Sequence, residues 1–498
     1  MVDKDLLKEA LAVAVSRGGD FADIFVESRQ VSAVGLEDGK VERTQSGTEA
    51  GAGVRVWSGD ATVYAYTNEL DREGLLRAAR IAAQALGNGQ KDVTVDLTSV
   101  RPELTFPVRE QPGDVAAERK AEMVRAADQS ARAVDTERIK QVMAGYGDLV
   151  QEVVIANTTG THVEGRRVRT RFVVQAVAAG NGVIQTGAEA GAGIVGFEFF
   201  DSHDPRRMGA TAAERAKALL SAEPAPSGRM PVVLSGTAGG TMVHEACGHG
   251  LEADLVQKGL SVYGGQEGRE VAAPAVTVVD DATLPDRYGS YAFDDEGVPA
   301  RSVTLIREGV LEDYLFDRLS AKKSGRESNG HGRRESYQHR PIPRMANTFI
   351  AAGKDAPDEI LREAGNGLLV RKMGGGQVNT TTGDFVFEVA EGYLIRDGEA
   401  GPMVRGATLT GNGPEVLRRV AMVGSDLEFT IGTCGKDGQG VPVSDAQPTM
   451  LVGRSRTDSP IVVGGTRQMG DGPEVRRVEN NADTEFSVRK YRGRIRRL

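Results

Sequence analysis

The sequence predicts an α+β fold in two domains. Alanine-rich helical patterns mix with antiparallel strand patterns up to residue 222, whereas short strands between glycine-rich turns fill most of the chain after residue 229. Between them, Ser221 to Gly228 has the proline- and alanine-rich composition of a linker. A chain of 498 residues is also too long for one hydrophobic core. We expect an N-terminal α+β domain over 1–222 and a mostly-β, barrel- or sandwich-like domain over 229–498.

The N-terminal domain is expected to open with an amphipathic helix within Met1–Gly18, because leucine and alanine recur there at helical spacing. Two short strands are expected next, at Ala22–Glu27 and Val31–Leu36, and the pair Asp38-Gly39 predicts a tight hairpin turn after them. Two alanine-rich helices are expected over Glu73–Leu86 and Val115–Val134. This mixture of helices and antiparallel strands is the basis for the α+β assignment.

One short echo raises the question of an internal repeat. The pentapeptide Glu-Ala-Gly-Ala-Gly occurs at Glu49–Gly53 and again at Glu189–Gly193. Five residues of this composition recur often by chance, so the echo carries little weight.

The second domain is expected to be built from short strands. Those predicted are Ala275–Val279, Val303–Ile306, Gly367–Val370, Asp384–Val389, Gly392–Ile395 and Met403–Arg405. The polar stretch Ala321–Tyr337 has no periodicity, and a mobile loop over a site and a disordered excursion are both open readings.

Composition excludes several classes of protein. The net charge of −9 gives no overall footprint for nucleic acid. No apolar run approaches the roughly 18 residues that a membrane-spanning helix needs, and two cysteines are too few for a disulfide-stapled secreted protein. We expect a cytoplasmic protein without nucleic-acid or membrane partners. The basic terminus Arg489–Leu498 fits an edge strand or frayed end better than a nucleic-acid arm.

Two histidines bracket a glutamate in His244-Glu245-Ala246-Cys247-Gly248-His249. The familiar zinc helix places its histidines four residues apart, about one turn. A spacing of five puts the second ring roughly 140° around a regular α-helix. Both rings can meet one ion only if the helix contains a π-turn or ends near Gly248 and Gly250. The spacing therefore predicts a local irregularity in the helix.

A catalytic zinc site usually has three protein ligands and one open position. His244 and His249 supply two, and Cys434, on a loop of small residues, is the best third candidate by composition. Cys247 is a rival, although a position so close to the histidines would crowd the ion, and packing in the core suits it better. A Cys247–Cys434 disulfide is a third possibility.

The remaining polar residues have roles to fill. Glu245 is the candidate general base, taking a proton from a metal-activated water and delivering it to the leaving amine. Glu252 and Asp254 are possible partners of the histidines. Candidates for an oxyanion donor, by residue type alone, are His331, His339, Arg340 and Arg344.

The motifs taken together resemble the TldD/PmbA family. The pieces that carry the resemblance are His244–Asp254, Lys258–Tyr263, Ser336-Tyr337, Pro343–Thr348 and Gly432–Lys436, in the family's order and over about half the chain. The resemblance implies a zinc peptidase with Cys434 as third ligand. It further implies unfolded or modified peptides as substrates, and a homodimer or a heterodimer with a related PmbA-type subunit that lacks the metal motif.

Two other functions stay open at this point. The chain could be a peptide-binding or scaffold protein with a structural or vestigial metal site, or a hydrolase of non-peptide esters or amides. An intact Glu245 favours the peptidase, since a structural site needs no acid beside its ligand. Zn²⁺ suits a His/His/Cys set, although Fe²⁺ or Co²⁺ could occupy it.

Overall fold

The computed structural model describes residues 2–87, 89, 93–180 and 182–465, all of which belong to one compact unit. The unit is a mixed α+β structure, as the sequence predicts. The basic terminus Arg489–Leu498 lies outside the described residues. No helix of the described ranges is long and apolar enough to cross a membrane.

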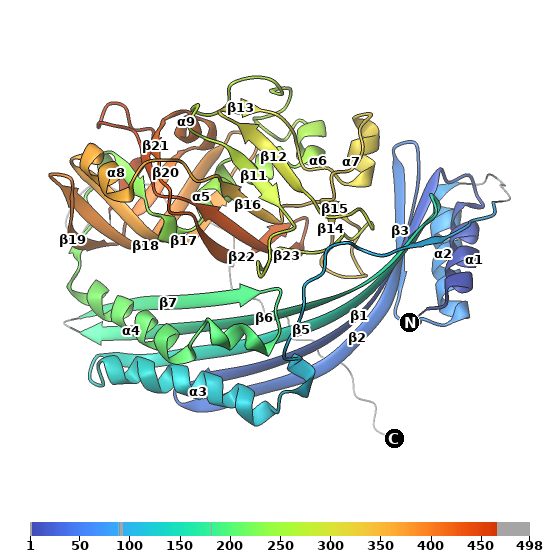
Figure 1. Ribbon diagram of the computed structural model, residues 1–498, viewed down its shortest axis with the longest axis horizontal. Helices are drawn as coiled ribbons and strands as arrows, with labels where there is room; N and C mark the ends of the chain where they lie inside the picture. Colours follow the sequence, from blue (N-terminus) through green and yellow to red (C-terminus); the bar gives the residue numbers. More distant parts are fainter. Residues whose placement is uncertain (1, 88, 90–92, 181, 466–498) are drawn as a thin grey trace, which may run out of the picture. The chain divides into compact units, whose positions relative to one another are not determined.

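A curved, seven-stranded sheet forms the N-terminal region (Figure 1). Its path runs β3-β2-β1-β5-β6-β4, with β7 also paired to β6, and only β4 runs parallel to its neighbour. The strands are β1 (Phe21–Glu37), β2 (Lys40–Ser58), β3 (Ala61–Thr67), β4 (Thr98–Val100), β5 (Ile139–Asn157), β6 (Thr161–Gly180) and β7 (Val183–Gly193). Asp38 and Gly39 both have positive φ, 48° and 77°, and make the expected tight turn between β1 and β2.

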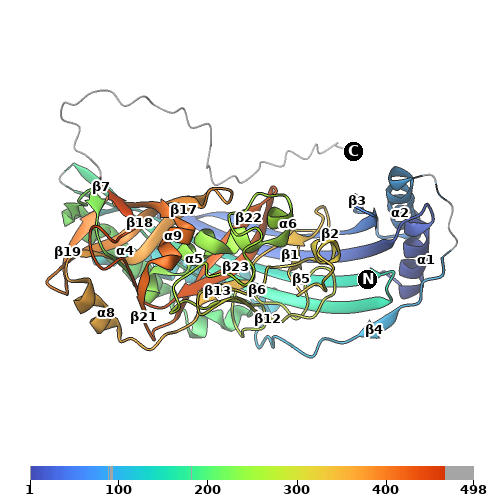
Figure 2. The ribbon, with the colours of Figure 1, turned by 90° about the horizontal axis from the view of Figure 1, so that it is seen from above.

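Four helices cover the sheet. They are α1 (Lys4–Val15), α2 (Arg72–Leu86), α3 (Ala117–Val134) and α4 (Pro205–Ser221), and short 3₁₀ turns lie at η1 (Pro112–Asp114) and η2 (Phe197–Asp201). Figure 2 shows α1 and α2 together at one end of the long strands. Helices α3 and α4 lie along the convex face, where Val124 and Ala212 share a buried apolar cluster with Phe172 of β6 (Figure 1).

The order of elements around the sheet occurs twice. Each half reads helix, three antiparallel strands, helix: α1-β1-β2-β3-α2, then α3-β5-β6-β7-α4. The first strands of the two halves pair antiparallel at the centre, where Val31 faces Leu149. The pentapeptide echo does not mark this repeat, because Glu49–Gly53 lies in the second strand of its half and Glu189–Gly193 in the third.

The C-terminal region contains a ten-stranded sheet, a six-stranded sheet and a two-stranded ribbon. The ten-stranded sheet holds β8 (Glu223–Pro224), β9 (Gly228–Arg229), β10 (Val232–Leu234), β17 (Gly367–Val378), β18 (Asp384–Arg396), β19 (Glu399–Arg405), β20 (Thr408–Asn412), β21 (Val420–Val423), β24 (Met450–Val452) and β25 (Val462–Gly464). The six-stranded sheet runs β13 (Val310–Leu311), β12 (Ser302–Arg307), β11 (Val278–Asp281), β16 (Asn347–Ile350), β23 (Gln439–Gln447) and β22 (Glu428–Lys436), so that β22 is an edge strand. The ribbon pairs β14 (Gly332–Arg333) with β15 (Ile342–Pro343).

Helices α7 (Arg318–Lys323), α8 (Pro357–Ala364) and α9 (Gly413–Arg418) complete the region outside the histidine segment. One large apolar cluster joins residues of both main sheets and of that segment. A smaller cluster is shared with the curved sheet, where Phe25 and Val163 pack with Phe293 and Tyr337. The division into domains at 222 and 229, and the barrel or sandwich description, remain predictions.

The polar stretch Ala321–Tyr337 divides into an exposed part, residues 322–327, and a later part that is mostly packed into the protein. His331 and Arg334 are buried, and the backbone N–H of Tyr337 donates to the Glu27 carboxylate of β1 at 2.8 Å. His331 bonds Asp280 and Arg334 bonds the carbonyl of Asp295, both in the C-terminal region, and the curved sheet adds Glu27. These partners explain how the later part of a stretch without apolar periodicity lies inside.

Candidate metal centre

The histidine segment changes helix type at the motif. Strand β10 leads through the turn η3 (Gly236–Ala238) into α5 (Thr241–Val243), then a π-helical turn, η4 (His244–Gly248), the 3₁₀ turn η5 (His249–Leu251) and α6 (Ala253–Gln257). The N–H of His249 donates to the carbonyl of His244, five residues back. The irregularity that the spacing predicts is therefore present as a π-turn.

Glycines let this irregular helix lie close to its neighbours. A Cβ at Gly240 would overlap the backbone N of Ala446 in β23, and one at Gly248 would overlap Sδ of Met345. The carbonyl of Ala246, inside the π-turn, accepts a hydrogen bond from the Tyr263 hydroxyl at 2.8 Å. The turn is thus held against β23 from one side and satisfied by a tyrosine from another.

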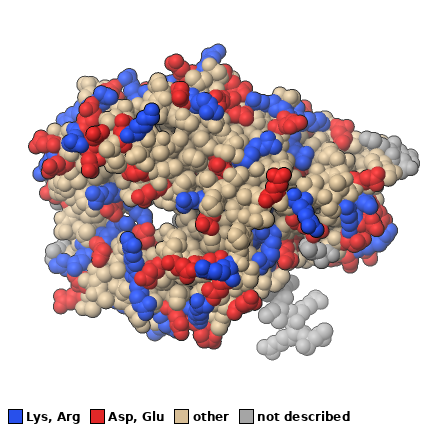
Figure 3. All heavy atoms as spheres, in the orientation of Figure 1, with Lys and Arg blue, Asp and Glu red and all other residues tan. Residues whose placement is uncertain are grey.

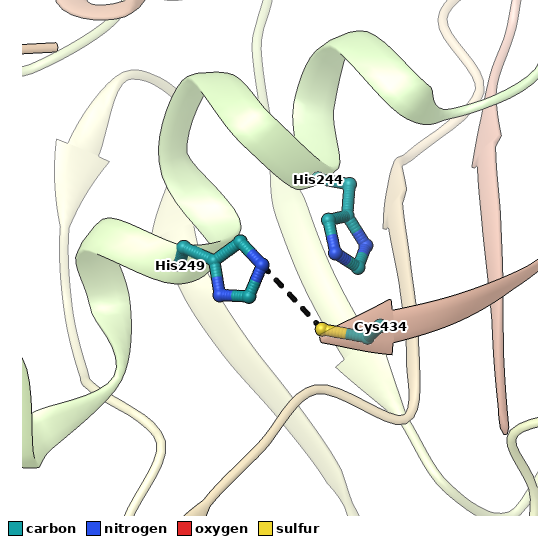
Figure 4. A group of neighbouring side chains, drawn as sticks. All are labelled: His244, His249 and Cys434. Carbon is teal, nitrogen blue, oxygen red and sulfur yellow. Dashed lines mark hydrogen bonds between the residues drawn. The ribbon is translucent and has the colours of Figure 1, made fainter. Parts of the chain in front are cut away.

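The π-turn and strand β22 bring His244, His249 and Cys434 together (Figure 4). One ligand atom from each lies within 4.8 Å of the others, and Nε2 of His249 is 3.4 Å from Sγ of Cys434. The two imidazole rings are 4.9 Å apart and nearly perpendicular, at 85°. Three side chains from segments almost 200 residues apart in sequence therefore converge on one point.

Each histidine is held by a carboxylate on its other nitrogen. Nδ1 of His244 is 2.7 Å from Oδ1 of Asp445 on β23, and Nδ1 of His249 is 3.0 Å from Oε2 of Glu252. Such partners fix the tautomer and ring orientation of ligand histidines, which leaves both Nε2 atoms for a metal. Glu252 takes the role that the sequence offered only as a possibility, and Asp254, offered with it, pairs instead with Lys258 and Lys436. No local pattern in the sequence pointed to Asp445.

Basic side chains surround Glu252 behind the site. Lys436 Nζ lies 3.1 Å from its Oε2, and Arg344 Nε lies 4.0 Å from its Oε1. Burial raises the pKa of the Glu252 carboxyl, but Lys436 and His249 outweigh burial and lower it to about 2. Arg344 also donates to the backbone carbonyl of Cys434, so it supports the ligand strand rather than facing the three ligands.

The other oxyanion candidates have different partners. His331 is fully buried between Asp280 and Asn329, and Nδ1 of His339 is 3.0 Å from Oγ of Ser336. Arg340 lies 4.0 Å from Asp437. In the described structure none of these contacts reaches the His/His/Cys group.

The electrostatics of the group favour metal ligation. Burial alone raises the pKa of the Cys434 thiol, but His244 and His249 outweigh it and hold the pKa well below its usual range. A thiolate with two imidazoles is the donor set that zinc and similar metals take. Burial raises the pKa of Glu245 against the lowering effect of the histidines, as suits a proton acceptor.

Cys247 does not join the group. Its side chain is fully buried in the apolar cluster, and Sγ contacts the carbonyl of Val243 at 3.4 Å. Burial raises the pKa of its thiol to about 12. Both cysteines are free thiols. The rival ligand and the disulfide considered from the sequence therefore have no support in the geometry.

A cavity of about 960 Å³ lies beside the histidine helix. It is lined by Thr241, one turn before Glu245, by Glu428–Ile431 of β22, and across from them by Glu189–Ala192 of β7. An opening between the curved sheet and the C-terminal region is visible in Figure 3. The space can admit an extended chain alongside the edge strand β22.

Two histidines at a π-turn, each backed by a carboxylate, and a cysteine on the neighbouring strand β22 form a ligand set of the metalloprotein class. Comparison of the sequence with family models gives a more specific class. The PmbA/TldA metallopeptidase domain 1 matches residues 22–86, the central domain 110–220 and the C-terminal domain 227–458. The chain belongs to the PmbA/TldA (TldD/PmbA) metallopeptidase family.

Individual relatives give the same assignment. The chain is 36% identical to a metalloprotease TldD homolog of Haemophilus influenzae, over 90% of this chain and 94% of that protein. It is 35% identical to a metalloprotease of Methanothermobacter thermautotrophicus, over 93% of this chain and all of that protein. Among solved structures, TldE of Thermococcus kodakarensis has a TM-score of 0.68 at 18% identity, over 90% of this chain and all of that one, which shows a shared fold.

Proposed function

We propose that this protein is a zinc-dependent peptidase acting on unfolded or modified peptides, with His244, His249 and Cys434 as metal ligands and Glu245 as general base. The observation that carries the proposal is the convergence of the three ligand atoms within 4.8 Å. The metalloprotease names of its relatives support the reaction class.

The residues present fit a metal because both histidines are oriented by carboxylates and the thiol is poised as a thiolate. When bound, zinc would supply a Lewis acid that polarises the scissile carbonyl and acidifies water. Glu245 takes up the proton of the attacking water and passes it to the leaving amine. Its raised pKa brings it closer to neutral pH, where one group can serve as both base and acid.

Peptide substrates suit the shape of the site. Strand β22 ends the six-stranded sheet and leaves backbone groups on its outer edge, beside the cavity of about 960 Å³. An extended peptide can pair with such an edge through its own backbone, whereas a folded protein cannot enter. This arrangement favours unfolded segments over native proteins.

The assembly we propose is a dimer, with a second copy or with a PmbA-type subunit, in the cytoplasm. Support for the dimer comes from the family relationship, and a chain with only two cysteines fits a reducing compartment. Light scattering of the purified chain, alone and with a PmbA-type subunit from the same organism, tests this assembly. A monomer in both samples contradicts it.

Metal content and peptide cleavage test the proposed chemistry together. Wild type should contain about one zinc, Cys434→Ser should lose it, and Cys247→Ser is the matched control that should keep it. Glu245→Gln should retain zinc but cleave an unstructured peptide about 10²–10⁴ times more slowly. If the wild-type protein contains zinc but cleaves no peptide, with or without the partner subunit, the peptidase proposal is wrong and a peptide-binding function is favoured.

A further inference from the structure

A second cavity, of about 480 Å³, lies between the curved sheet and the C-terminal region. Six arginines line it: Arg29, Arg167, Arg169, Arg171, Arg333 and Arg334. Only three carboxylate residues share the lining, namely Asp148, Asp295 and Glu335. The cavity therefore carries an excess of positive charge in a chain whose net charge is −9.

Half of these arginines come from one strand. Arg167, Arg169 and Arg171 alternate along β6, so their side chains share the face turned towards the C-terminal region. Arg167 and Arg169 are 8% and 5% exposed. Arg171 is exposed and lines the cavity, and its guanidinium has no ion pair or hydrogen bond with any described residue. Along β6, the buried guanidinium groups of Arg167 and Arg169 are therefore followed by the exposed, unpaired guanidinium of Arg171.

The carboxylates of the lining are already engaged. Asp295 pairs with Arg167 at 2.6 Å, and Asp148 pairs with Lys120 at 2.8 Å. The Glu335 carboxylate accepts from the backbone N–H of Gly440 at 2.6 Å. None of the three forms an ion pair with Arg169 or Arg171 in the described ranges.

Arg169 is a buried cation that forms no ion pair with any described residue, and Arg333 of the same lining is another. The Arg169 guanidinium donates to the backbone carbonyls of Tyr288 at 3.0 Å and Ser290 at 2.9 Å. Burial, together with the charges of Arg167 and Arg333, lowers its pKa to about 9. A buried charge held by carbonyls alone is costly, and an anion in the cavity would relieve that cost.

Strand β22, which carries the ligand Cys434, borders both cavities. Thr433 of β22 lines the arginine-lined cavity and precedes the ligand Cys434, while Glu428–Ile431 of the same strand line the larger cavity beside the histidine helix. A peptide lying along β22 would therefore have one end among the arginines.

We propose that the arginine-lined cavity binds a carboxylate of the substrate peptide, either its C-terminal carboxylate or an Asp or Glu side chain near it. This inference rests on the proposed function and adds a preference for acidic ends. Guanidinium groups match carboxylates in paired hydrogen bonds. A nucleic acid fits less well, because this cavity is small and partly enclosed and the rest of the chain is acidic.

Binding measured without turnover tests the proposal. Full-length Glu245→Gln protein is titrated with an unstructured peptide in three forms: free acid with acidic residues near its end, the same peptide amidated, and one with those residues changed to Asn and Gln and amidated. The acidic forms should bind about tenfold more tightly than the neutral one. Comparing the first two forms separates the terminal carboxylate from the side chains.

Variants locate the effect. In the Glu245→Gln protein, a second substitution, Arg171→Gln, should remove most of the preference for acidic over neutral peptides. Arg169→Gln should do the same if the variant folds. Arg166→Gln is the control, since Arg166 lies on the opposite face of β6, is exposed and bonds Gln111. The Arg166→Gln variant should keep the full preference for acidic peptides.

Three results would overturn the site: equal binding of acidic and neutral peptides, a preference that survives Arg171→Gln, or a short single-stranded oligonucleotide that displaces the acidic peptide. Wild-type protein that cleaves no peptide would instead count against the proposed reaction. A carboxylate preference that Arg171→Gln abolishes would still establish the site in that case.

Discussion

His244 and His331 are both buried in the C-terminal region, and each bonds an aspartate. Both nitrogens of His331 are occupied, since Nε2 is 3.0 Å from Asp280 and Nδ1 is 3.1 Å from the carbonyl of Asn329. In His244 only Nδ1 contacts an aspartate, Asp445, and the other ring nitrogen, Nε2, faces Cys434. A buried histidine–aspartate pair is thus a structural element when both nitrogens are engaged and a ligand unit when one is spare.

The largest expected difference follows from removing each ring. His244→Ala should abolish stoichiometric zinc binding, because two ligands rarely hold the ion. His331→Ala should leave about one zinc per chain but lower the free energy of unfolding by about 1–3 kcal/mol, since Asp280 loses a buried partner. Elemental analysis and denaturant unfolding of both variants make the comparison. Loss of zinc from a folded His331→Ala variant would contradict the assignment of His331 as a purely structural residue.

Substitution of the two aspartates, Asp445 and Asp280, should produce a smaller difference in zinc binding than substitution of the two histidines. Asp445→Asn should weaken zinc affinity about 10–100-fold, because the orienting carboxylate of His244 is lost. Asp280→Asn should leave affinity unchanged. Competition with a chromophoric chelator measures both, and equal affinities for the two variants would show that Asp445 does not support a ligand.

The number of protons released on zinc binding also distinguishes the ligand histidines from His331. Burial lowers the pKa of each site histidine, but Asp445 raises that of His244 well above its usual value, and Glu252 and Cys434 raise that of His249 to about 10. Metal binding must displace these protons, whereas the Cys434 thiolate has none to lose. Zinc uptake near neutral pH should release about two protons and strengthen as pH rises.

Calorimetry in buffers of different ionisation enthalpy counts those protons. His331→Gln should release the same number, because His331 is not a ligand. Uptake without proton release would mean that the histidines are neutral in the metal-free protein, contrary to the expectation.

The smallest effect concerns stability and pH at the structural pair. Burial raises the pKa of Asp280, but hydrogen bonds from His331 and Thr348 outweigh it and lower the pKa below its ordinary value of 3.8. Its contribution is therefore complete above about pH 4 and is lost as pH falls through the lowered pKa. Metal-free Asp280→Asn should lose stability relative to wild type at pH 7, and the gap in melting temperature should narrow at pH 3. A gap that widens in acid contradicts this sign.

Local features of the site were predictable from sequence, and distant ones less so. The five-residue spacing of His244 and His249 requires an irregular helix, and a π-turn is present. Cys434 could be nominated because only two cysteines occur. Asp445 had no signal, since one aspartate in a strand gains its role only when β23 is placed beside the helix.

The fold shows the same limit. The sequence suggests two short strands in place of β1, because polar residues Ser28-Arg29-Gln30 interrupt the apolar pattern. In the sheet these residues are paired on both sides, with β2 and with β5. Likewise Arg334 looked like part of an exposed loop, yet it is buried and donates to the carbonyl of Asp295 at 2.9 Å. Polarity marks exposure only where no tertiary partner exists.

The π-turn also separates this chain from the common zinc helices by an insertion rather than by substitutions. Exchanging side chains cannot convert a five-residue spacing into a four-residue one; one residue between His244 and His249 must be removed, with loss of the wide turn that Tyr263 satisfies. A pattern search tuned to the shorter spacing passes over this site.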